Sequence, residues 1–317
     1  MYREKKICVI VPAYNEEQLI AKTVENVPDF VDRIVVIDDG SKDRTVEIVQ
    51  GIAAQNNKVL LIRHEHNLGV GMALSTGYMW CRNNGIDITV VMNGDNQMDP
   101  ADLSALINPL VENRADYTKG NRLITGEAWQ KIPHIRYLGN SILTLLTKIV
   151  SGYWHVTDSQ SGYTAMNKKA LHLLPLDDLY PGYGVPNDIL VTLNIYNMRV
   201  MDVPVSPVYG VGEKSKIRIR KVVFSISFLL FRLFFRRMFQ KYTLRDFHPL
   251  IFFYALGIFI LLLNIPLTIR LFIRWSTTDF IPTINALAIL FCSLTGLQLI
   301  LFAMLFDMEA NIELKGK

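Results

Sequence analysis

The sequence has few cysteines and no long apolar segment near its N-terminus. Cys8, Cys81 and Cys292 lie far apart and lack the short spacing of metal ligands, so neither a disulfide scaffold nor a cysteine metal site is expected. We interpret them as buried free thiols in a reducing compartment. The first apolar run covers only residues 7–11, too short for the core of a secretory signal. We therefore expect a buried strand there and no export of the N-terminal region.

Charged residues are missing from two long stretches near the C-terminus. Residues 250–269 and 280–306 contain no Asp, Glu, Lys or Arg, and about 20 helical residues cross a bilayer core. We predict two transmembrane helices; the alternative is two buried core helices, which are rarely so long without charge. Pro266 and Pro282 are expected near helix ends, where a missing N–H donor is tolerated.

Acidic residues are missing from residues 214–245, which contain ten Lys and Arg. The rest of the chain has 23 basic and 29 acidic residues, so the positive charge is local and no nucleic-acid partner is expected. Because the basic segment precedes the first predicted span, the positive-inside rule favours a cytosolic position for it and for both termini. Arg270 and Arg274, between the spans, weaken this signal.

The first 210 residues alternate short β-branched runs with helical patterns. This alternation predicts an α/β fold with a mainly parallel, Rossmann-like sheet and helices on both faces. Ligands of such sheets bind beyond the carboxyl ends of the strands. The predicted strands are residues 7–11, 33–37, 59–62 and 88–92, and the predicted helices are residues 16–26, 43–55, 69–84 and 100–112.

Three polar loops follow the first, second and fourth predicted strands. They are residues 12–17 (PAYNEE), 38–45 (DDGSKDRT) and 93–100 (NGDNQMDP). Carboxylates at one sheet edge suit a ribose, a base and a divalent cation on a diphosphate. For residues 38–41 alone, a turn with a helix N-cap is the simpler interpretation. Three such loops at one edge favour the ligand site.

These loops, with residues 67–71 (NLGVG) and 158–163 (DSQSGY), resemble the motifs of glycosyltransferase family 2, which has the GT-A fold. The resemblance covers about residues 5–220. The two trailing spans make the chain similar to polyprenyl-phosphate sugar synthases of the dolichol-phosphate mannose or glucose type. This resemblance implies an inverting transfer of a hexose (mannose, glucose or N-acetylglucosamine) from a UDP- or GDP-sugar to dolichyl or undecaprenyl phosphate.

The resemblance also implies a domain order. Residues 1–212 would form the GT-A catalytic domain, and residues 213–247 a basic acceptor loop with two short interfacial amphipathic helices. Residues 248–309 would form the two spans and residues 310–317 a cytosolic tail. The protein would lie in the cell membrane, or in the endoplasmic reticulum membrane of a eukaryote, with its catalytic domain cytosolic.

By the same resemblance, one set of residues would bind the nucleotide and another the cation. Asp95 and Gln97 would hold Mg²⁺ or Mn²⁺ on the donor diphosphate. Asn93 stands where the family has the first carboxylate of its D-x-D motif; its amide oxygen adds no charge, so we expect weaker metal binding, with an inactive protein as the alternative. The predicted nucleotide-binding residues are Pro12, Tyr14, Glu16, Asp38, Asp39, Asn93 and Gly94.

The predicted catalytic residues are Asp95, Asp158, Gln160 and Asp188. The resemblance implies that Asp158 and Gln160, before the predicted strand 163–167, contact the donor sugar or the acceptor. Asp188 is either the general base or an N-cap of the predicted helix 189–197. A sugar hydroxyl needs a base, whereas an ionised lipid phosphate can attack directly, so both interpretations stay open.

Basic residues are placed to hold an acceptor phosphate. In residues 214–220, charged side chains alternate with Ser and Ile, which puts the charges on one face of an extended segment. Arg provides a bidentate fork for phosphate, and Lys a point charge. By resemblance, the predicted acceptor-phosphate residues are Arg122, Arg136, Lys214, Ser215, Lys216 and Arg218.

Two weaker signals lie in residues 64–71. His64 and His66 have a spacing that suits a metal, but a solvated turn is favoured. Gly69 and Gly71 open a predicted helix; a phosphate cradle is less favoured there than a tight helix entry.

Two other functions are alternatives to this transfer. A processive polysaccharide synthase would need a Q-x-x-R-W signature, but Leu271 stands at the Gln position before Arg274 and Trp275. Asn93 motivates the second alternative, a non-catalytic nucleotide-binding membrane scaffold. The sequence is compatible with a homo-oligomer but does not set its size.

Overall fold

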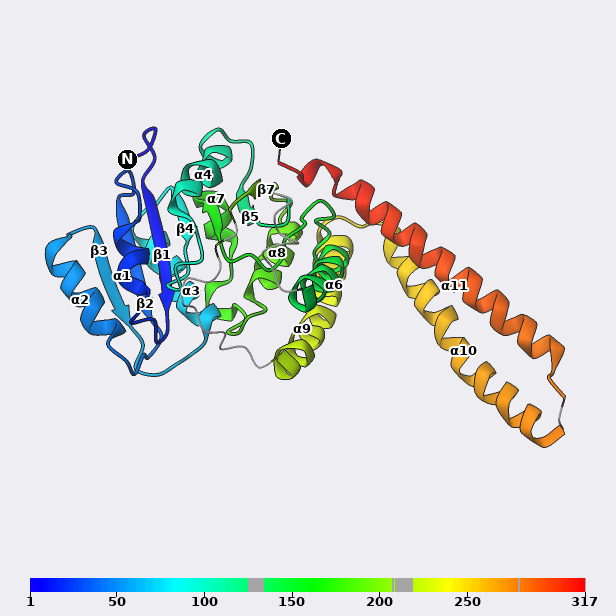
Figure 1. Cartoon of the computed structure of the whole chain (residues 1–317). Coiled ribbons are helices and arrows are strands. Elements are labelled where there is room, and N and C mark those ends of the chain that lie inside the picture. Colours follow the sequence, from blue (N-terminus) through cyan, green and yellow to red (C-terminus); the bar gives the residue numbers. More distant parts are fainter. Residues whose placement is uncertain (125–133, 207, 209–218, 279, 317) are drawn as a thin grey trace. The chain divides into compact units, whose positions relative to one another are not determined.

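The computed structural model describes residues 1–124, 134–206, 208, 219–278 and 280–316. The chain forms two compact units. Unit 1 comprises Met1–Arg237 and Glu313–Lys317, and unit 2 comprises Met238–Ile312. Each unit is described by itself (Figure 1).

A seven-stranded sheet with the order β3-β2-β1-β4-β6-β5-β7 forms the centre of the described part of unit 1. Among the described strands, β6 alone runs antiparallel to its neighbours. The mainly parallel GT-A-like sheet is confirmed. The strands are β1 (Ile7–Ala13), β2 (Arg33–Asp38), β3 (Val59–Arg63), β4 (Ile88–Val91), β5 (Tyr117–Asn121), β6 (Thr164–Asn167) and β7 (Val200–Pro204).

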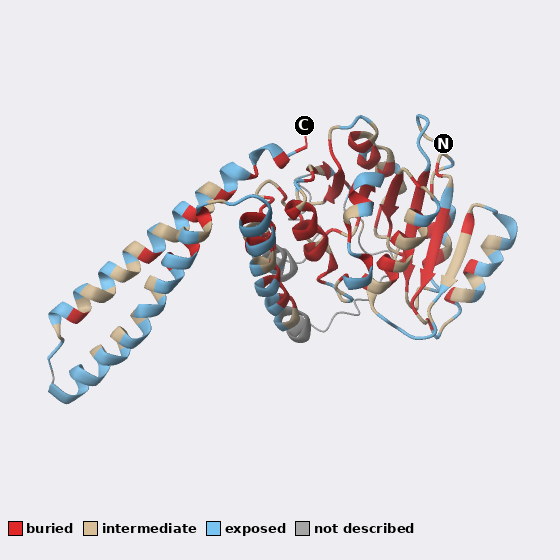
Figure 2. Cartoon of the chain, turned by 180° about the vertical axis from the view of Figure 1, so that it is seen from behind, coloured by how far each residue is buried: buried red, intermediate tan, exposed pale blue. Residues whose placement is uncertain are grey.

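Helices cover both faces of the sheet, as expected. Every residue of β1 is buried, and its side chains alternate between two cores. Cys8 and Ile10 pack with α3, α7 and α8, whereas Val9 and Val11 pack with α1, α2 and α4. Figure 2 shows the buried strands between helices whose outer faces are exposed. The helices are α1 (Ile20–Glu25), α2 (Thr45–Gln55), α3 (Val70–Asn83), α4 (Leu103–Val111), α7 (Lys168–Leu173) and α8 (Val185–Ile195), with short 3₁₀ turns η1 (Pro100–Asp102) and η2 (Leu176–Asp178).

A third core joins α6 (His134–Ser151), α8 and α9 (Ile219–Phe239). On α9, Ile226, Leu229, Leu230 and Leu233 are buried against Val150 of α6 and against α8. The expectation of two short interfacial helices is wrong: α9 is continuous for 21 residues and is followed by the π-helical turn η3 (Gln240–Arg245). The i, i+3, i+4, i+7 spacing of these apolar residues explains the continuity, because it gives one helix a single packed face.

Unit 2 contains two long apolar helices, α10 (Leu250–Thr278) and α11 (Thr283–Ala310), followed by the 3₁₀ turn η4 (Ile312–Leu314). In the described part of the chain, these two are long and apolar enough to cross a membrane. Only 17% and 11% of their most apolar windows is buried, which disfavours the alternative of buried core helices. Pro282 is the N-cap of α11, as expected, but Pro266 lies inside α10. The expectation for Pro266 is wrong because α10 continues beyond the uncharged stretch, through Arg270 and Arg274.

The two helices of unit 2 approach closely at a pair of glycines. A Cβ atom on Gly257 would lie 3.1 Å from the carbonyl oxygen of Gly296 and 2.9 Å from Cγ1 of Ile300. Asn264 Nδ2 donates to Ser293 Oγ at 3.0 Å. Small residues and polar side chains of this kind hold apolar helices together where lipid removes the hydrophobic driving force.

Gly257→Leu should therefore destabilise the helical hairpin by about 1–3 kcal/mol, because the new side chain overpacks the contact. Thermal denaturation of the full chain in detergent, followed by the far-ultraviolet helix signal, measures the loss. Leu256→Ala is the control, since Leu256 is 50% exposed and should change the transition little. Equal transitions for the two variants would contradict the proposed contact.

Candidate active site

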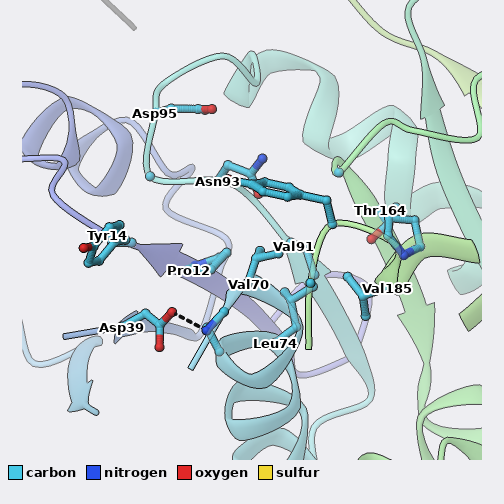
Figure 3. A pocket seen from close by; sticks show the side chains of 18 of the residues that line it. Pro12, Tyr14, Asp39, Val70, Leu74, Val91, Asn93, Asp95, Thr164 and Val185 are labelled. Atoms are coloured by element: carbon cyan, nitrogen blue, oxygen red, sulfur yellow. Dashed lines mark hydrogen bonds between the residues drawn. The ribbon is translucent and has the colours of Figure 1, made fainter. Parts of the chain in front are cut away.

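A pocket of about 390 Å³ opens at the carboxyl ends of β1, β2 and β4. The three polar loops predicted to meet at one sheet edge contribute to its lining. Figure 3 shows Tyr14 and Asp39 on one side of this pocket, with Asn93 and Asp95 beyond them. The polar lining residues are Tyr14, Glu16, Asp39, Asn67, Asn93, Asp95, Gln97, Gln160, Ser161, Thr164 and the phenols of Tyr78, Tyr117 and Tyr183, with Pro12, Gly69, Gly94 and Gly162 between them.

Hydrogen bonds join the loop after β1 to the loop after β2. The backbone N–H of Asn15 donates to Ser41 Oγ at 2.8 Å, and Asn15 Oδ1 accepts from the N–H of Lys42 at 2.8 Å. The N–H of Glu16 donates to Thr45 Oγ1 at 2.8 Å. These contacts fix the backbone beside Pro12, Tyr14 and Glu16, so these three predicted nucleotide-binding residues occupy one ordered rim.

The structure separates the two adjacent aspartates of the loop after β2. Asp38 is fully buried and is not among the residues lining the pocket. Its Oδ2 accepts from the N–H of Ser41 at 3.2 Å and lies 3.8 Å from Nε of Arg63, so the predicted turn is present. Asp39 lines the pocket. Adjacent side chains point to opposite sides of an extended chain, which explains the division.

The Asp39 carboxylate organises the entry to α3. It accepts from the N–H groups of Leu68 at 2.9 Å and Gly69 at 2.8 Å, and it lies 2.8 Å from Nδ1 of His64. Figure 3 marks a hydrogen bond of this carboxylate. Nε2 of His64 lies 2.9 Å from Thr76 Oγ1.

The expectation of a solvated turn for His64 is wrong. His64 follows β3 directly, and β3 is paired in parallel with β2, so the ring meets Asp39 at the same sheet edge. That position was the signal in the sequence that could have identified His64 as a positioning residue.

Gly69 and Gly71 make a tight helix entry, as favoured. The N–H of Gly71 donates to the carbonyl of Pro181 at 2.8 Å, and a Cβ on Gly69 would lie 2.5 Å from the same oxygen. Gly69 has a φ of +97°, which few other residues adopt. The close approach brings the loop after η2 against the pocket, where Tyr183 lines the wall.

Asn93, Asp95 and Gln97 line the pocket together. Asp95 Oδ1 accepts from the N–H of Gln97 at 3.2 Å, so the loop folds back on its own carboxylate. Nε2 of Gln97 is buried and has no hydrogen-bond partner among the described residues. One carboxylate with amide oxygens is a hard donor set that suits Mg²⁺ or Mn²⁺. The residues present therefore fit a divalent cation.

The protein provides few charged ligands for such a cation. Within the described ranges, no group of three or more His, Cys, Asp or Glu side chains is placed to hold a metal. A cation at Asp95 would therefore need the diphosphate oxygens of the donor to complete its coordination.

Asp158 is buried and paired with Arg122. Nε of Arg122 lies 2.8 Å from Oδ2 and Nη2 lies 3.0 Å from Oδ1, a bidentate arrangement. Burial alone would raise the pKa of Asp158, but the charge and hydrogen bonds of Arg122, with the charge of Lys119, hold it below the usual range. Asp158 is not among the pocket-lining residues, whereas Gln160 and Ser161, in the same loop, are.

Lys119 is a buried residue of this region that the sequence interpretation did not single out. It is fully buried on β5, and its ammonium donates to the carbonyl of Ser161. Burial lowers the pKa of Lys119 to about 8, partly offset by Asp158 and Asp202. A lysine in a strand of otherwise uncharged residues was the available signal, because a central strand rarely buries a charge without a partner.

Asp188 is not an N-cap. The N-cap of α8 is Gly184, and the helix begins at Val185 with a proline in its first turn, a position where proline is favoured. The N-cap interpretation is wrong because Pro186 starts the helix before Asp188. Asp188 Oδ1 lies 2.8 Å from Nη2 of Arg236, and Oδ2 accepts from the N–H of Tyr180 at 3.0 Å. Asp188 is not among the residues that line the pocket.

The structure does not describe the side chains of the remaining predicted acceptor residues. Lys214, Ser215, Lys216 and Arg218 lie outside the described residues. Arg136 belongs to α6, but its side chain lies outside what the structure describes. Their contact with an acceptor phosphate stays a prediction.

A mainly parallel sheet with a polar pocket at its carboxyl edge, and a loop whose Asp95 and amide groups fit a divalent cation, is the arrangement expected of a GT-A glycosyltransferase. A family model described as glycosyl transferase family 2 matches residues 8–174. The chain belongs to this family and is a glycosyltransferase.

Three curated relatives indicate where in the family the chain lies. It is 32% identical over 251 residues to a UDP-N-acetylglucosamine–dolichyl-phosphate N-acetylglucosaminyltransferase of Methanococcus voltae, covering 75% of this chain and 97% of the relative. It is 25% identical to a dolichyl-phosphate beta-glucosyltransferase of Trichomonas vaginalis, covering 76% of each chain. It is 27% identical to an undecaprenyl-phosphate mannosyltransferase of Micrococcus luteus, covering 63% of this chain and 83% of the relative.

Solved structures confirm the fold. Glucosyl-3-phosphoglycerate synthase of Mycobacterium tuberculosis, in complex with Mn²⁺, UDP and phosphoglyceric acid, matches with a TM-score of 0.56 and 21% identity, covering 74% of this chain and 78% of that chain. Its complex with Mg²⁺ and UDP matches with a TM-score of 0.54, 21% identity, and coverage of 74% and 79%.

Arg122→Met should cost about 3–5 kcal/mol of stability at pH 7, because it leaves the Asp158 carboxylate buried without its partner. The lowered pKa of Asp158 means that the stabilisation is present above the unfolded-state pKa of about 3.9 and is lost as the pH falls through the folded-state value. The difference between wild type and variant should therefore shrink in acid. Unfolding measured at pH 7 and at several values down to pH 3 tests this.

Arg114→Met is the matched control, since Arg114 pairs with Glu112 at the surface, where both side chains are 40% exposed. It should cost far less than Arg122→Met, because water screens an exposed ion pair. If Arg122→Met costs no more than Arg114→Met at pH 7, the buried pair does not stabilise this loop.

Proposed function

We propose that the protein transfers one hexose from a UDP- or GDP-sugar to a polyprenyl phosphate, with inversion at the anomeric carbon. The products are a polyprenyl-phosphate hexose and a nucleoside diphosphate. The observation that carries the proposal is that one pocket gathers Tyr14, Asp39, Asn93 and Asp95 from the ends of three parallel strands. The relatives named for dolichyl and undecaprenyl phosphate support the acceptor class.

In this proposal, the pocket rim binds the donor. Pro12, Tyr14, Glu16 and Asp39 line the side assigned to the nucleoside, and Asn93, Gly94 and Asp95 line the side assigned to the diphosphate. Asp95, with Gln97, would hold Mg²⁺ or Mn²⁺. The cation would neutralise the charge that develops on the departing diphosphate. Because Asn93 adds no charge, the donor's own oxygens would carry more of the coordination.

The acceptor needs no general base, since a phosphate monoester is ionised at neutral pH and can attack directly. The contacts of the two other predicted catalytic carboxylates support this view. Asp158 is paired with Arg122, and Asp188 with Arg236. We assign Asp158 and Asp188 to positioning the pocket loops. Gln160, which lines the pocket, would contact the sugar or the acceptor.

The acceptor phosphate would be held by cations near the membrane. Arg122 has a side chain that is 25% exposed, and its guanidinium is held in place by Asp158. We propose that Arg122, Arg136, Lys214, Ser215, Lys216 and Arg218 form this phosphate site, as the sequence predicts.

An apolar surface of unit 1 fits the headgroup region of a bilayer. On α9, opposite its packed face, Phe224, Phe228, Phe231 and Phe235 are 49–79% exposed and follow i, i+4, i+7, i+11 spacing. Ile142, Leu145 and Leu146 of α6 are also exposed. We propose that this face lies in the cytosolic membrane interface, with α10 and α11 as the two spans, in the cell membrane or in the endoplasmic reticulum membrane of a eukaryote.

Nitroxide labels on the full chain in proteoliposomes test this orientation. A label at Phe228→Cys or Phe231→Cys should collide more with oxygen than with a polar nickel complex, because the site is in contact with lipid. A label at Glu47→Cys, on an exposed residue of α2, should show the opposite preference. Cys292→Ser removes the only cysteine that is not buried. Labels at 228 and 47 with the same accessibility would contradict membrane contact.

The transfer itself is tested with the full chain in detergent, Mn²⁺, a labelled nucleotide sugar and a polyprenyl phosphate. One labelled sugar should move to the lipid with release of one nucleoside diphosphate, and polyprenol without phosphate should accept none. Products with many sugars would favour a processive synthase. No transfer from UDP-N-acetylglucosamine, UDP-glucose or GDP-mannose would favour a non-catalytic scaffold.

Asp95→Ala should lower turnover by at least about 100-fold, because it removes the electrostatic stabilisation of the leaving diphosphate. Asp99→Ala is the matched control in the same loop: Asp99 caps η1 and does not line the pocket. Its turnover should stay close to that of wild type. Near-normal activity of Asp95→Ala at limiting Mn²⁺ would refute the cation assignment.

A further inference from the structure

The pocket continues below its polar rim into an apolar space, here called the inner chamber. Its walls are aliphatic side chains from α3, β4 and α8, and three hydroxyl-bearing side chains stand among them. Figure 3 shows Val70, Leu74, Val91 and Val185 around this part of the pocket, with Thr164 beside Val185. The chamber is lined by Val70, Leu74, Val91, Val185 and Ile189 with Tyr78, Tyr117 and Thr164.

The inner chamber adjoins the diphosphate side of the pocket. Val91 is the last residue of β4, two positions before Asn93, and it pairs with Thr164 of β6. A Cβ on Gly162 would lie 3.1 Å from Nδ2 of Asn93, so the loop before β6 closes directly on the predicted cation loop. A sugar attached to a diphosphate held at Asp95 would therefore stand over the chamber.

The chamber contains a buried hydroxyl with incomplete hydrogen bonding. Tyr78 is 1% exposed, and within the described part of the chain its hydroxyl has Thr164 beside it but no hydrogen bond of full geometry. A buried hydroxyl in this state is costly unless a ligand completes it. Tyr117, on β5, is buried beside it, and burial raises the pKa of both phenols above the usual value. Both therefore remain neutral hydrogen-bond donors at physiological pH.

These features suit an acetamido substituent of the sugar better than a hydroxyl. A hydroxyl directed into aliphatic walls would lose water without enough partners. An acetamido group places a methyl group against such walls, and its carbonyl oxygen needs one donor. The chamber supplies the aliphatic walls from Leu74, Val91 and Val185, and the donor from Tyr78.

We propose that the inner chamber is a binding site for the acetamido group of the donor sugar, so that the protein prefers a 2-acetamido-2-deoxyhexose donor to glucose or mannose. The proposal deepens the proposed function and rests on it for the identity of the pocket as the donor site. Selectivity arises from apolar contact of the methyl group and from the hydrogen bond that Tyr78 gives to the carbonyl oxygen.

The first experiment compares two donors that differ at this substituent, UDP-N-acetylglucosamine and UDP-glucose, with the full chain in detergent, Mn²⁺ and polyprenyl phosphate. The kcat/KM ratio should favour the acetamido donor by about 10- to 200-fold, the range that an apolar pocket gives for one small group. A ratio of one or less, or a preference for GDP-mannose, overturns the acetamido site while the proposed transfer stands.

The second experiment changes one atom of the chamber. Tyr78→Phe should lower the donor ratio by about 2- to 10-fold through the lost hydrogen bond. It should lower the thermal midpoint of the free protein less than the control does, because the contact of its hydroxyl with Thr164 is not a full hydrogen bond. Tyr153→Phe is the matched control: Tyr153 is equally buried, does not line the pocket, and donates to the carbonyl of Met198 at 2.7 Å. It should lower the thermal midpoint and leave the ratio unchanged. An unchanged ratio in Tyr78→Phe overturns the assignment of that hydroxyl.

Donor binding without acceptor separates failure of this proposal from failure of the proposed function. Calorimetric titration with each UDP-sugar and Mn²⁺ should show tighter binding of the acetamido donor, whether or not the lipid is turned over. Tighter binding without transfer supports the acetamido site and contradicts the assignment of polyprenyl phosphate as the acceptor. Equal affinities overturn the acetamido site and leave the donor pocket standing, whereas no binding of either sugar overturns the donor pocket of the proposed function as well.

Discussion

The site depends on β1, β2 and β4 running in the same direction. Parallel pairing of β1 with β2 and with β4 puts the polar loops that follow them at one edge. Within that edge, the Asp39 carboxylate joins the end of β2 to His64 and to the entry of α3. If β2 shifted by one residue, Asp39 would point away from the pocket and Asp38 into it. The geometry of the donor site therefore follows from strand direction and register.

Two buried carboxylates show how charge supports this geometry. Asp158 with Arg122 fixes the loop before β6, and Asp188 with Arg236 fixes the start of α8 to α9. Because Asp188 also accepts from the N–H of Tyr180, the helix with the exposed phenylalanines is connected to a wall of the pocket. A sugar acceptor would need such a carboxylate as a general base. Here both carboxylates are paired with arginines, which suits an acceptor that is already ionised.

The sequence predicted much of the fold, because local signals carried it. β-branched runs placed β1 to β4, and the polar loops after β1, β2 and β4 identified the pocket edge. The uncharged stretches predicted α10 and α11. Tertiary packing and local helix chemistry decided the rest. The core that α9 shares with α8 made α9 one continuous helix. Pro186, in the first turn of α8, placed the start of that helix before Asp188.

Single-residue roles were harder to predict than the site. Asp38 and Asp39 are adjacent acids with equal sequence signals, and only the register of β2 assigns Asp39 to the pocket. His64 needed the parallel β2–β3 pairing to be recognised, and Lys119 needed the loop that carries Ser161 to fold over β5. The inner chamber combines residues from α3, β4, β5, β6 and α8, a combination that no local pattern encodes.

The donor site requires that this pocket bind a nucleotide sugar through a cation at Asp95. Crystals of the full chain grown with UDP and Mn²⁺, measured near the manganese absorption edge, test this requirement. One anomalous peak is expected within coordination distance of an Asp95 carboxylate oxygen and the UDP diphosphate, with the uridine beside Asp39. A diphosphate bound elsewhere, or a manganese peak away from Asp95, would contradict it.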